Sequence, residues 1–140
     1  MRAAAIDLGS TRIGLAVSDE LGLLAHPRPY LPACSSGQLV ERLSKLASNE
    51  GVQVFVIGLP KTLDGREGPL ARRARAIAAQ LKQGTACRVV LVDERLSTHQ
   101  AHAQLQTLGF DARERKSRVD SVAAAILLQT FLDAERGRSG

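Results

Sequence analysis

Two apolar runs near the N-terminus, residues 3–7 and 12–18, are separated only by the segment LGST at 8–11. A link this short favours two strands that lie side by side and run antiparallel. The first run ends on Asp7. A carboxylate at the end of a buried strand is costly unless a cation, a hydrogen-bonding loop or a metal ion compensates it. This hairpin therefore constrains the fold and supplies the first functional candidate.

The rest of the chain alternates between helical stripes and short apolar runs. The expected further strands are 21–27, 52–58 and 88–94. The expected helices have apolar stripes over 39–47, 70–81 and 101–108, and a last helix covers about 119–135. We interpret the Pro- and Ser-rich segment at 27–37 as a loop, and DARERKSR at 111–118 as a basic linker.

This order of elements predicts an α/β fold. Three meandering strands followed by alternating helices and strands imply a mixed five-stranded sheet, with three antiparallel N-terminal strands and then two parallel ones. Helices are expected on both faces of this sheet. The 140 residues suit one domain, which we place at 1–136 and follow with a disordered tail at 137–140.

Charge and composition limit the class of partner. The net charge is +5 and the isoelectric point is near 9.9, which favours a polyanion such as nucleic acid as partner. Cys34 and Cys87 lie far apart and fit neither a zinc ribbon nor a redox motif. No apolar run has the length of a membrane span or a signal peptide, so we expect a cytoplasmic protein without a membrane partner.

Acidic residues stand where the predicted elements begin or end. Asp7 ends the first strand, the pair Asp93 and Glu94 ends the last strand, and Asp120 lies in the first turn of the last helix. The carboxyl ends of parallel strands meet at one edge of a sheet, where ligands gather. Converging carboxylates repel one another, and Mg²⁺ or Mn²⁺ relieves this repulsion. Two such ions about 4 Å apart would suit phosphodiester hydrolysis.

Each acidic residue also has a simpler interpretation. Asp93 or Glu94 is able to pair with Arg95, and backbone N–H groups are able to hold Asp7. Asp120 suits the positive end of a helix dipole, although residues 124, 127 and 131 on its face are apolar. These alternatives compete for any single residue and weaken when all must be explained together.

Four segments together resemble the YqgF/RuvX family, a compact branch of the RNase H-like superfamily. The segments are DLGSTRIGLAVSD at 7–19, GLPKTLDGREGP at 58–69, DERLST at 93–98 and VDSVAAAILLQTFL at 119–132. Members are variously called Holliday-junction resolvases and pre-16S rRNA nucleases. The resemblance implies an RNase H-like fold and metal-dependent hydrolysis of phosphodiester bonds.

Carried over by position, the resemblance assigns Asp7, Glu94 and Asp120 as catalytic metal ligands, with Asp93 as the alternative to Glu94. It departs from the family at Thr11, where a Lys commonly precedes the Arg that is Arg12 here. We expect substrate contacts from residues near this rim of the sheet and from the basic linker. They are Thr11, Arg12, Lys61, Arg66, Arg95, Arg113, Arg115, Lys116 and Arg118.

Three classes of function remain open at this point. The first is a Mg²⁺- or Mn²⁺-dependent endonuclease that acts on structured RNA, such as the 5′ end of pre-16S rRNA, or on a Holliday junction. The second is an RNA-binding factor without catalysis. The third is an ATPase of the sugar-kinase or actin type, whose first phosphate motif is similar to residues 7–19 but which needs two domains. For the nuclease, we expect a monomer or a homodimer.

Overall fold

A computed structural model describes residues 1–62, 64–93 and 112–139, and within 112–139 it describes the side chains of 121–137. Five strands and three helices are formed in these ranges. The strands are β1 (Arg2–Leu8), β2 (Arg12–Ser18), β3 (Ala25–Pro32), β4 (Val52–Leu59) and β5 (Arg88–Asp93). The helices are α1 (Ser36–Glu50), α2 (Pro69–Gly84) and α4 (Ala112–Ser139).

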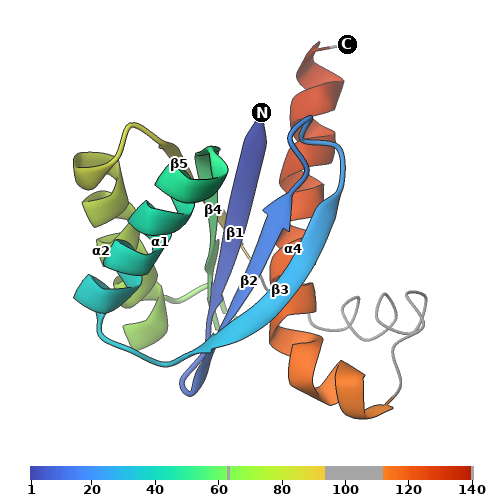
Figure 1. Ribbon diagram of the computed structural model, residues 1–140. Coiled ribbons are helices and arrows are strands. Elements are labelled where there is room, and N and C mark those ends of the chain that lie inside the picture. Colours follow the sequence, from blue (N-terminus) through green and yellow to red (C-terminus); the bar gives the residue numbers. More distant parts are fainter. Residues whose placement is uncertain (63, 94–111, 140) are drawn as a thin grey trace.

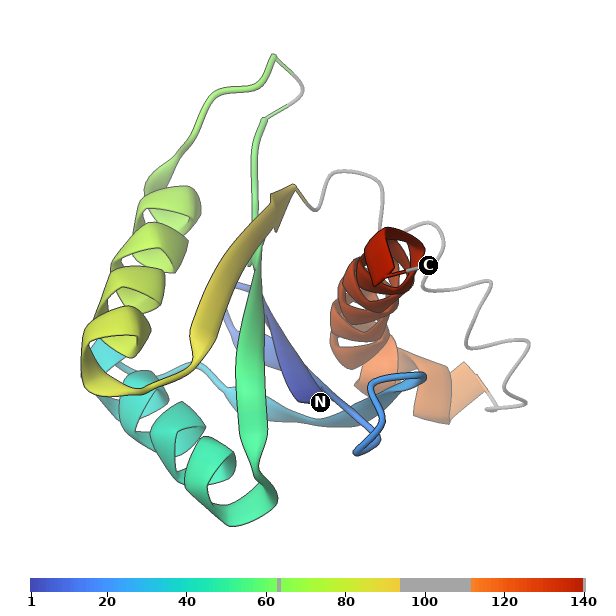
Figure 2. The ribbon, with the colours of Figure 1, turned by 90° about the horizontal axis from the view of Figure 1, so that it is seen from above.

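The strands form one mixed sheet in the order β3-β2-β1-β4-β5. β1 pairs antiparallel with β2, and β2 pairs antiparallel with β3, whereas β1, β4 and β5 are mutually parallel. α1 and α2 cover one face of the sheet and α4 crosses the other (Figures 1 and 2). This arrangement confirms the expected mixed five-stranded α/β fold.

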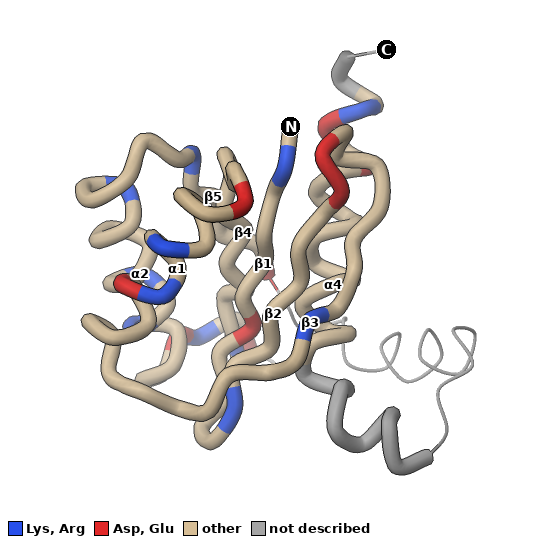
Figure 3. The backbone as a smooth tube through the Cα atoms, in the orientation of Figure 1, with Lys and Arg blue, Asp and Glu red and all other residues tan. Residues whose placement is uncertain are grey.

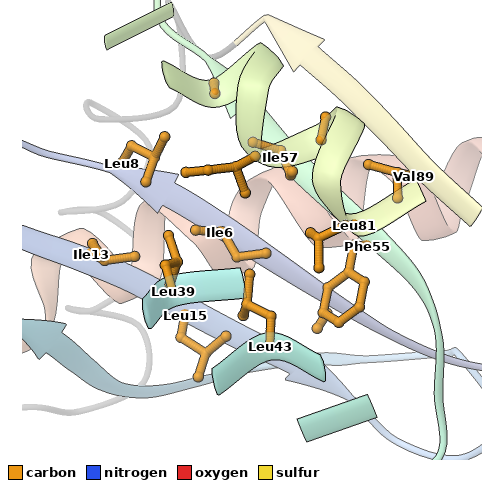
Figure 4. Close-up of a cluster of buried hydrophobic side chains, with 14 of the residues drawn as sticks. Ile6, Leu8, Ile13, Leu15, Leu39, Leu43, Phe55, Ile57, Leu81 and Val89 are labelled. Carbon is orange, nitrogen blue, oxygen red and sulfur yellow. The ribbon is translucent and has the colours of Figure 1, made fainter. Parts of the chain in front are cut away.

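Each face of the sheet has its own buried cluster. Ile6 of β1, Phe55 and Ile57 of β4 and Leu39 of α1 belong to the cluster on the α1–α2 face (Figure 4). On the opposite face, small residues of the sheet such as Ala5 pack against α4. Side chains alternate between the two faces along each strand, so membership of a cluster shows which way a strand residue points.

The β1–β2 hairpin depends on a close backbone approach at Gly9. The Gly9 N–H donates to the carbonyl of Arg12 at 2.9 Å. A Cβ atom at Gly9 would lie 2.7 Å from that same carbonyl oxygen, which is closer than real Cβ contacts come. The glycine in LGST therefore permits the tight turn that brings Thr11 and Arg12 back beside the end of β1.

The third strand differs from the prediction. It was expected at 21–27, with a loop from 27 to 37, but β3 extends from Ala25 to Pro32 and runs through three prolines. Proline lacks the N–H that a central strand needs, but an edge strand tolerates it where that bond would face solvent. β3 is the edge of the sheet, and its register with β2 shifts between Ile13 and Leu15.

The last helix also begins earlier than predicted. α4 starts at Ala112, so residues 112–118 of the segment predicted as a basic linker are helical. Its Ala, Arg, Glu and Lys residues have high helix propensity, which outweighs the polar composition on which the linker prediction rested. The predicted helix over 101–108 lies outside the described residues. No helix in the described ranges is long and apolar enough to cross a bilayer.

Candidate functional site

Asp7 lies near the carboxyl end of β1 on the face that α4 crosses. Ala3 and Ala5 of β1 pack in the cluster with α4, and Asp7 continues this alternation. Its antiparallel partner in β2 is Gly14. On its other side, one residue beyond the Ile6–Ile57 pair, β4 places Gly58. The half-buried carboxylate thus stands between two positions without side chains.

Asp93 ends β5 at the same edge of the sheet but on the other face. It pairs with Leu59, whose side chain is buried in the cluster with α1 and α2. Leu91 packs against this same cluster, whereas Val90 and Val92 pack on the α4 face. Alternation along β5 therefore points Asp93 away from the face of Asp7. The exposed Asp93 does not join Asp7 on that face.

α4 is anchored close to Asp7 by a buried serine. Ser121 is fully buried, and its Oγ accepts a hydrogen bond from the N–H of Leu15 at 3.3 Å. Leu15 adjoins Gly14, the strand partner of Asp7. Asp120 precedes Ser121 within α4, so its backbone lies in the turn that docks beside Asp7.

Arg12 and Thr11 lie at the hairpin on the same edge of the sheet. Ile13 packs in the α1–α2 cluster, so Arg12 alternates onto the face of Asp7. Its Cζ atom lies 4.8 Å from the centre of the Tyr30 ring in β3. Thr11 is exposed, and its carbonyl accepts a hydrogen bond from the N–H of Ala33 at 3.1 Å.

The loop after β4 brings Lys61 and Arg66 to this edge. Arg66 is 84% exposed, and its Nε lies 3.0 Å from Asp64 Oδ2. A hydrogen bond from the Thr62 hydroxyl is the largest cause that lowers the pKa of Asp64, followed by one from the Arg66 N–H. The loop is thus closed on itself around an ionised carboxylate, with Arg66 on its outside.

The base of this loop is fixed to α2. Arg75 donates two hydrogen bonds of 2.6 Å to the carboxylate of Glu67, and these bonds lower the pKa of Glu67.

Arg73 of α2 joins this helix to the start of α1. It donates to the Cys34 carbonyl and, at 3.3 Å, to Ser36 Oγ. Among the residues that Figure 3 colours, Lys and Arg are spread over strands, α1, α2 and the C-terminal part of α4.

Several predicted residues fall outside what the structure describes. Glu94 and Arg95 lie in the segment 94–111. The side chains of five predicted residues of α4 are also not described: Arg113, Arg115, Lys116, Arg118 and Asp120. Among the described side chains, no group of three His, Cys, Asp or Glu could hold a metal ion. Asp7 supplies the oxygen ligand that Mg²⁺ and Mn²⁺ prefer, next to two glycines, so the part of the site that is described fits a hard cation.

Two residues near Asp7 were not predicted from the sequence. Ser121 lies between Asp120 and the apolar run VAAAILL at 122–128, and this position at the start of the run was the available signal. Tyr30 lies between prolines in a segment predicted to be a loop, so no strand alternation linked it to Arg12. Arg73 and Arg75 of α2, which the sequence did not single out, have the specific partners described above.

Comparisons with known proteins agree over nearly the whole chain. The family model described as RuvX, Holliday junction resolvase, matches residues 1–134. A relative from Anaeromyxobacter sp. (strain K), named pre-16S rRNA nuclease, is 40% identical over 133 residues, covering 95% of this chain and 97% of its own. A relative of the same name from Geobacillus kaustophilus is 38% identical over 138 residues, covering 97% of this chain and 100% of its own.

Solved structures share the fold at low identity. Thermus thermophilus RuvC in complex with a Holliday junction substrate superposes with a TM-score of 0.66 at 16% identity, covering 98% of this chain and 96% of that chain. The Fowlpox virus resolvase with Holliday junction DNA gives a TM-score of 0.61 at 10% identity, covering 96% and 99%. These likenesses confirm the RNase H-like resolvase fold.

Proposed function

Because the chain belongs to the RuvX family of nucleases, we propose that it is a divalent-metal-dependent endonuclease that hydrolyses phosphodiester bonds. The observation that carries this proposal is the position of Asp7. It stands at the carboxyl end of a central strand, between Gly14 and Gly58, on the face where α4 docks through Ser121. This is the edge of an open α/β sheet at which ligands bind.

The proposed metal ligands are Asp7, Glu94 and Asp120. Glu94 is preferred to Asp93, because β5 alternation turns Asp93 to the face of α1 and α2. The anchoring of Ser121 beside the partner of Asp7 supports Asp120 as the third ligand. When bound, Mg²⁺ or Mn²⁺ would activate water and stabilise the leaving oxygen.

The proposed substrate contacts surround this edge. Arg12 shares the face of Asp7, and Thr11 belongs to the same hairpin. Lys61 and Arg66 belong to the loop that follows β4. Arg95 and the basic start of α4 complete the set: Arg113, Arg115, Lys116 and Arg118. Contacts of this kind bind the phosphate backbone and carry little sequence identity.

The proposed substrate is the 5′ end of pre-16S rRNA, the RNA after which the relatives are named. A Holliday junction is the second candidate, and the description of the matching family favours it. Resolution of a symmetric junction requires two cuts, so that candidate also requires a homodimer. The RNA candidate is compatible with a monomer.

Cleavage by the purified chain tests the proposal. An RNA with the precursor 5′ end and a four-way DNA junction are each incubated with Mg²⁺, Mn²⁺ or EDTA, and product lengths are measured. We expect cleavage only with metal. The variant Asp7→Asn should lose cleavage by roughly a hundredfold or more, because a ligand to the metal contributes several kcal/mol to the transition state.

The matched control is Glu41→Gln, which removes an exposed carboxylate on α1 that pairs with Lys45 at 3.3 Å. This variant should cleave like the unaltered protein. Equal cleavage by Asp7→Asn and the unaltered protein would contradict the proposed site. Cleavage of the junction but not the RNA would favour the resolvase, and metal-independent binding without cleavage of either would favour a non-catalytic factor.

A further inference from the structure

Arg12 and Tyr30 form a pair on neighbouring strands beside the proposed site. Arg12 pairs with Pro32 across the β2–β3 ladder, and Tyr30 lies two residues before Pro32. Such diagonal positions share a face and are within reach of long side chains. The guanidinium carbon lies 4.8 Å from the ring centre, which is within the range of a cation–π contact.

The pair faces the same side of the sheet as Asp7. Arg12 lies two positions before Gly14, the strand partner of Asp7. Two residues of a strand span roughly 7 Å. A phosphodiester whose scissile bond lies at Asp7 has its neighbouring phosphates within reach of a side chain as long as arginine.

Arg12 differs from other arginines of the molecule in its partner. Arg28, Arg66 and Arg75 each have a carboxylate oxygen within hydrogen-bond distance. Over residues 1–62, 64–93 and 121–137, no carboxylate pairs with Arg12, and its partner is an aromatic ring. A ring holds the plane of a guanidinium while the N–H groups at its edge remain available for two parallel bonds to a phosphate.

We propose that Tyr30 is a positioning residue that holds the Arg12 guanidinium ready for a phosphate of the nucleic acid next to the cleavage site. The proposal rests on the proposed nuclease function for the identity of the ligand. It concerns binding, which is measurable in EDTA without cleavage. Tyr30 is half-buried on the edge strand, so replacing it disturbs little of the core.

Four variants separate this role from simple packing: Tyr30→Leu, Tyr30→Phe, Arg12→Ala and the double variant Arg12→Ala/Tyr30→Leu. Dissociation constants are measured in EDTA for the precursor RNA and the four-way junction. Tyr30→Leu should weaken binding roughly three- to tenfold, and Tyr30→Phe should not, because phenylalanine keeps the ring face. In the Arg12→Ala background, Tyr30→Leu should have no further effect.

The control is the other cation–π pair found among the described side chains. Arg88 lies 5.5 Å from the ring of Phe131 and begins β5, at the opposite end of the sheet. Arg88→Ala removes the same charge from a cation–π contact, together with the ion pair that Arg88 makes with Glu135 at 3.2 Å, and it should change binding less than twofold. A further variant, Arg12→Lys, keeps the charge but loses the planar guanidinium. In the Arg12→Lys background, as in the Arg12→Ala background, Tyr30→Leu should not weaken binding further.

Equal affinity of Tyr30→Leu and the unaltered protein would overturn the proposal. So would an equal loss from Tyr30→Leu with and without Arg12, since the ring would then act independently of the guanidinium. A protein that binds and shows the expected coupling, but never cleaves with Mg²⁺ or Mn²⁺, would refute the nuclease and leave this inference standing. Failure of the unaltered protein to bind either nucleic acid would refute both.

Discussion

At the scale of single residues, an ion pair joins the edge strand to the end of a helix. Arg28 of β3 donates two hydrogen bonds to the carboxylate of Glu50 in α1, at 2.7 and 3.2 Å. Arg2 donates to the Glu50 carbonyl at 2.8 Å. The hydrogen bond from Arg28 is the largest cause that lowers the pKa of Glu50, and partial burial opposes it. Three elements, β1, β3 and α1, therefore meet at Glu50, two of them through its carboxylate and one through its carbonyl.

This pair predicts a pH-dependent contribution to stability. A carboxyl whose pKa is lower in the folded state stabilises the fold above its unfolded pKa, and loses this effect as the pH falls through its folded pKa. Glu50→Gln should lower the free energy of unfolding at pH 7 by about 1 kcal/mol or less, because Arg28 is 41% exposed and solvent screens the pair. In acid, where Glu50 of the unaltered protein is protonated in both the folded and the unfolded state, the two proteins should converge.

Urea unfolding at a series of pH values checks this prediction. The control is Glu41→Gln, whose carboxylate is 68% exposed, so its removal should leave the stability nearly unchanged at every pH. A constant difference between Glu50→Gln and the unaltered protein from pH 7 into acid would contradict an electrostatic origin.

At the scale of elements, two described side chains of α4, Ser121 and Gln129, form hydrogen bonds with the backbone of distant segments. Near the proposed site, Ser121 accepts from the N–H of Leu15. Two turns later, Gln129 Oε1 accepts from the N–H of Ala25 at 2.9 Å and Gln129 Nε2 donates to the Leu23 carbonyl at 3.0 Å. Ser121 adjoins Asp120, whereas Gln129 lies two turns away. Variants at these two residues therefore distinguish an effect on the position of Asp120 from an effect on the docking of the whole helix.

We expect Ser121→Ala and Gln129→Ala to have different effects on metal binding. Each should lower the free energy of unfolding by about 1–3 kcal/mol, because each leaves a backbone N–H without its acceptor. Only Ser121→Ala should weaken binding of Mn²⁺, measured by electron paramagnetic resonance of the folded variants. An equal loss of Mn²⁺ affinity in Gln129→Ala would show that the overall docking of α4 matters instead.

Much of this arrangement was predictable because periodicity reflects burial directly. The run at 52–58 is apolar on both faces and became β4, and Gly51 ends α1 with a φ of 71°, as a left-handed cap requires. β3 was predicted wrongly, because prolines usually mark loops and only the sheet order shows that this strand is an edge. The helix propensity of the Ala, Arg, Glu and Lys residues favours a helix at the start of α4, but the linker prediction was based on the polar composition of this segment.

The candidate site was predictable only in part. The end of an apolar run located Asp7, because strand ends gather ligands. The proposed preference for Glu94 over Asp93 rests on the direction of the β5 side chains, which depends on the register with β4 and not on the local sequence. Ser121 and Tyr30 act through contacts between distant segments, such as 121 with 15, that no local pattern encodes.

At the scale of the whole molecule, the two faces of the sheet differ in the side chains that they bury. α1 and α2 seal one face with large aliphatic side chains, whereas the face of Asp7 has small residues under α4. The net charge of +5 adds an attraction to polyanions that does not depend on their sequence. The binding free energy should therefore depend strongly on salt.

We predict that the logarithm of the binding constant falls linearly with the logarithm of salt concentration. Each phosphate contact contributes a slope of roughly 0.7 for single strands and 0.9 for duplex DNA. The eight predicted basic contacts therefore bound the slope at about 7. Fluorescence anisotropy in EDTA measures it for the RNA and the junction. A binding constant that is independent of salt would contradict an electrostatic interface.

The prolines of β3 also affect how readily the protein aggregates at high concentration. Exposed strand edges are templates on which another chain can add a strand, and this addition begins many aggregates. Pro27, Pro29 and Pro32 interrupt the row of donors on this edge. During synthesis β3 emerges long before α4 covers its sheet, so the nascent chain has a protected edge while its apolar face is still open. The three prolines that made this segment look like a loop in the sequence therefore also hinder the addition of a strand from another chain.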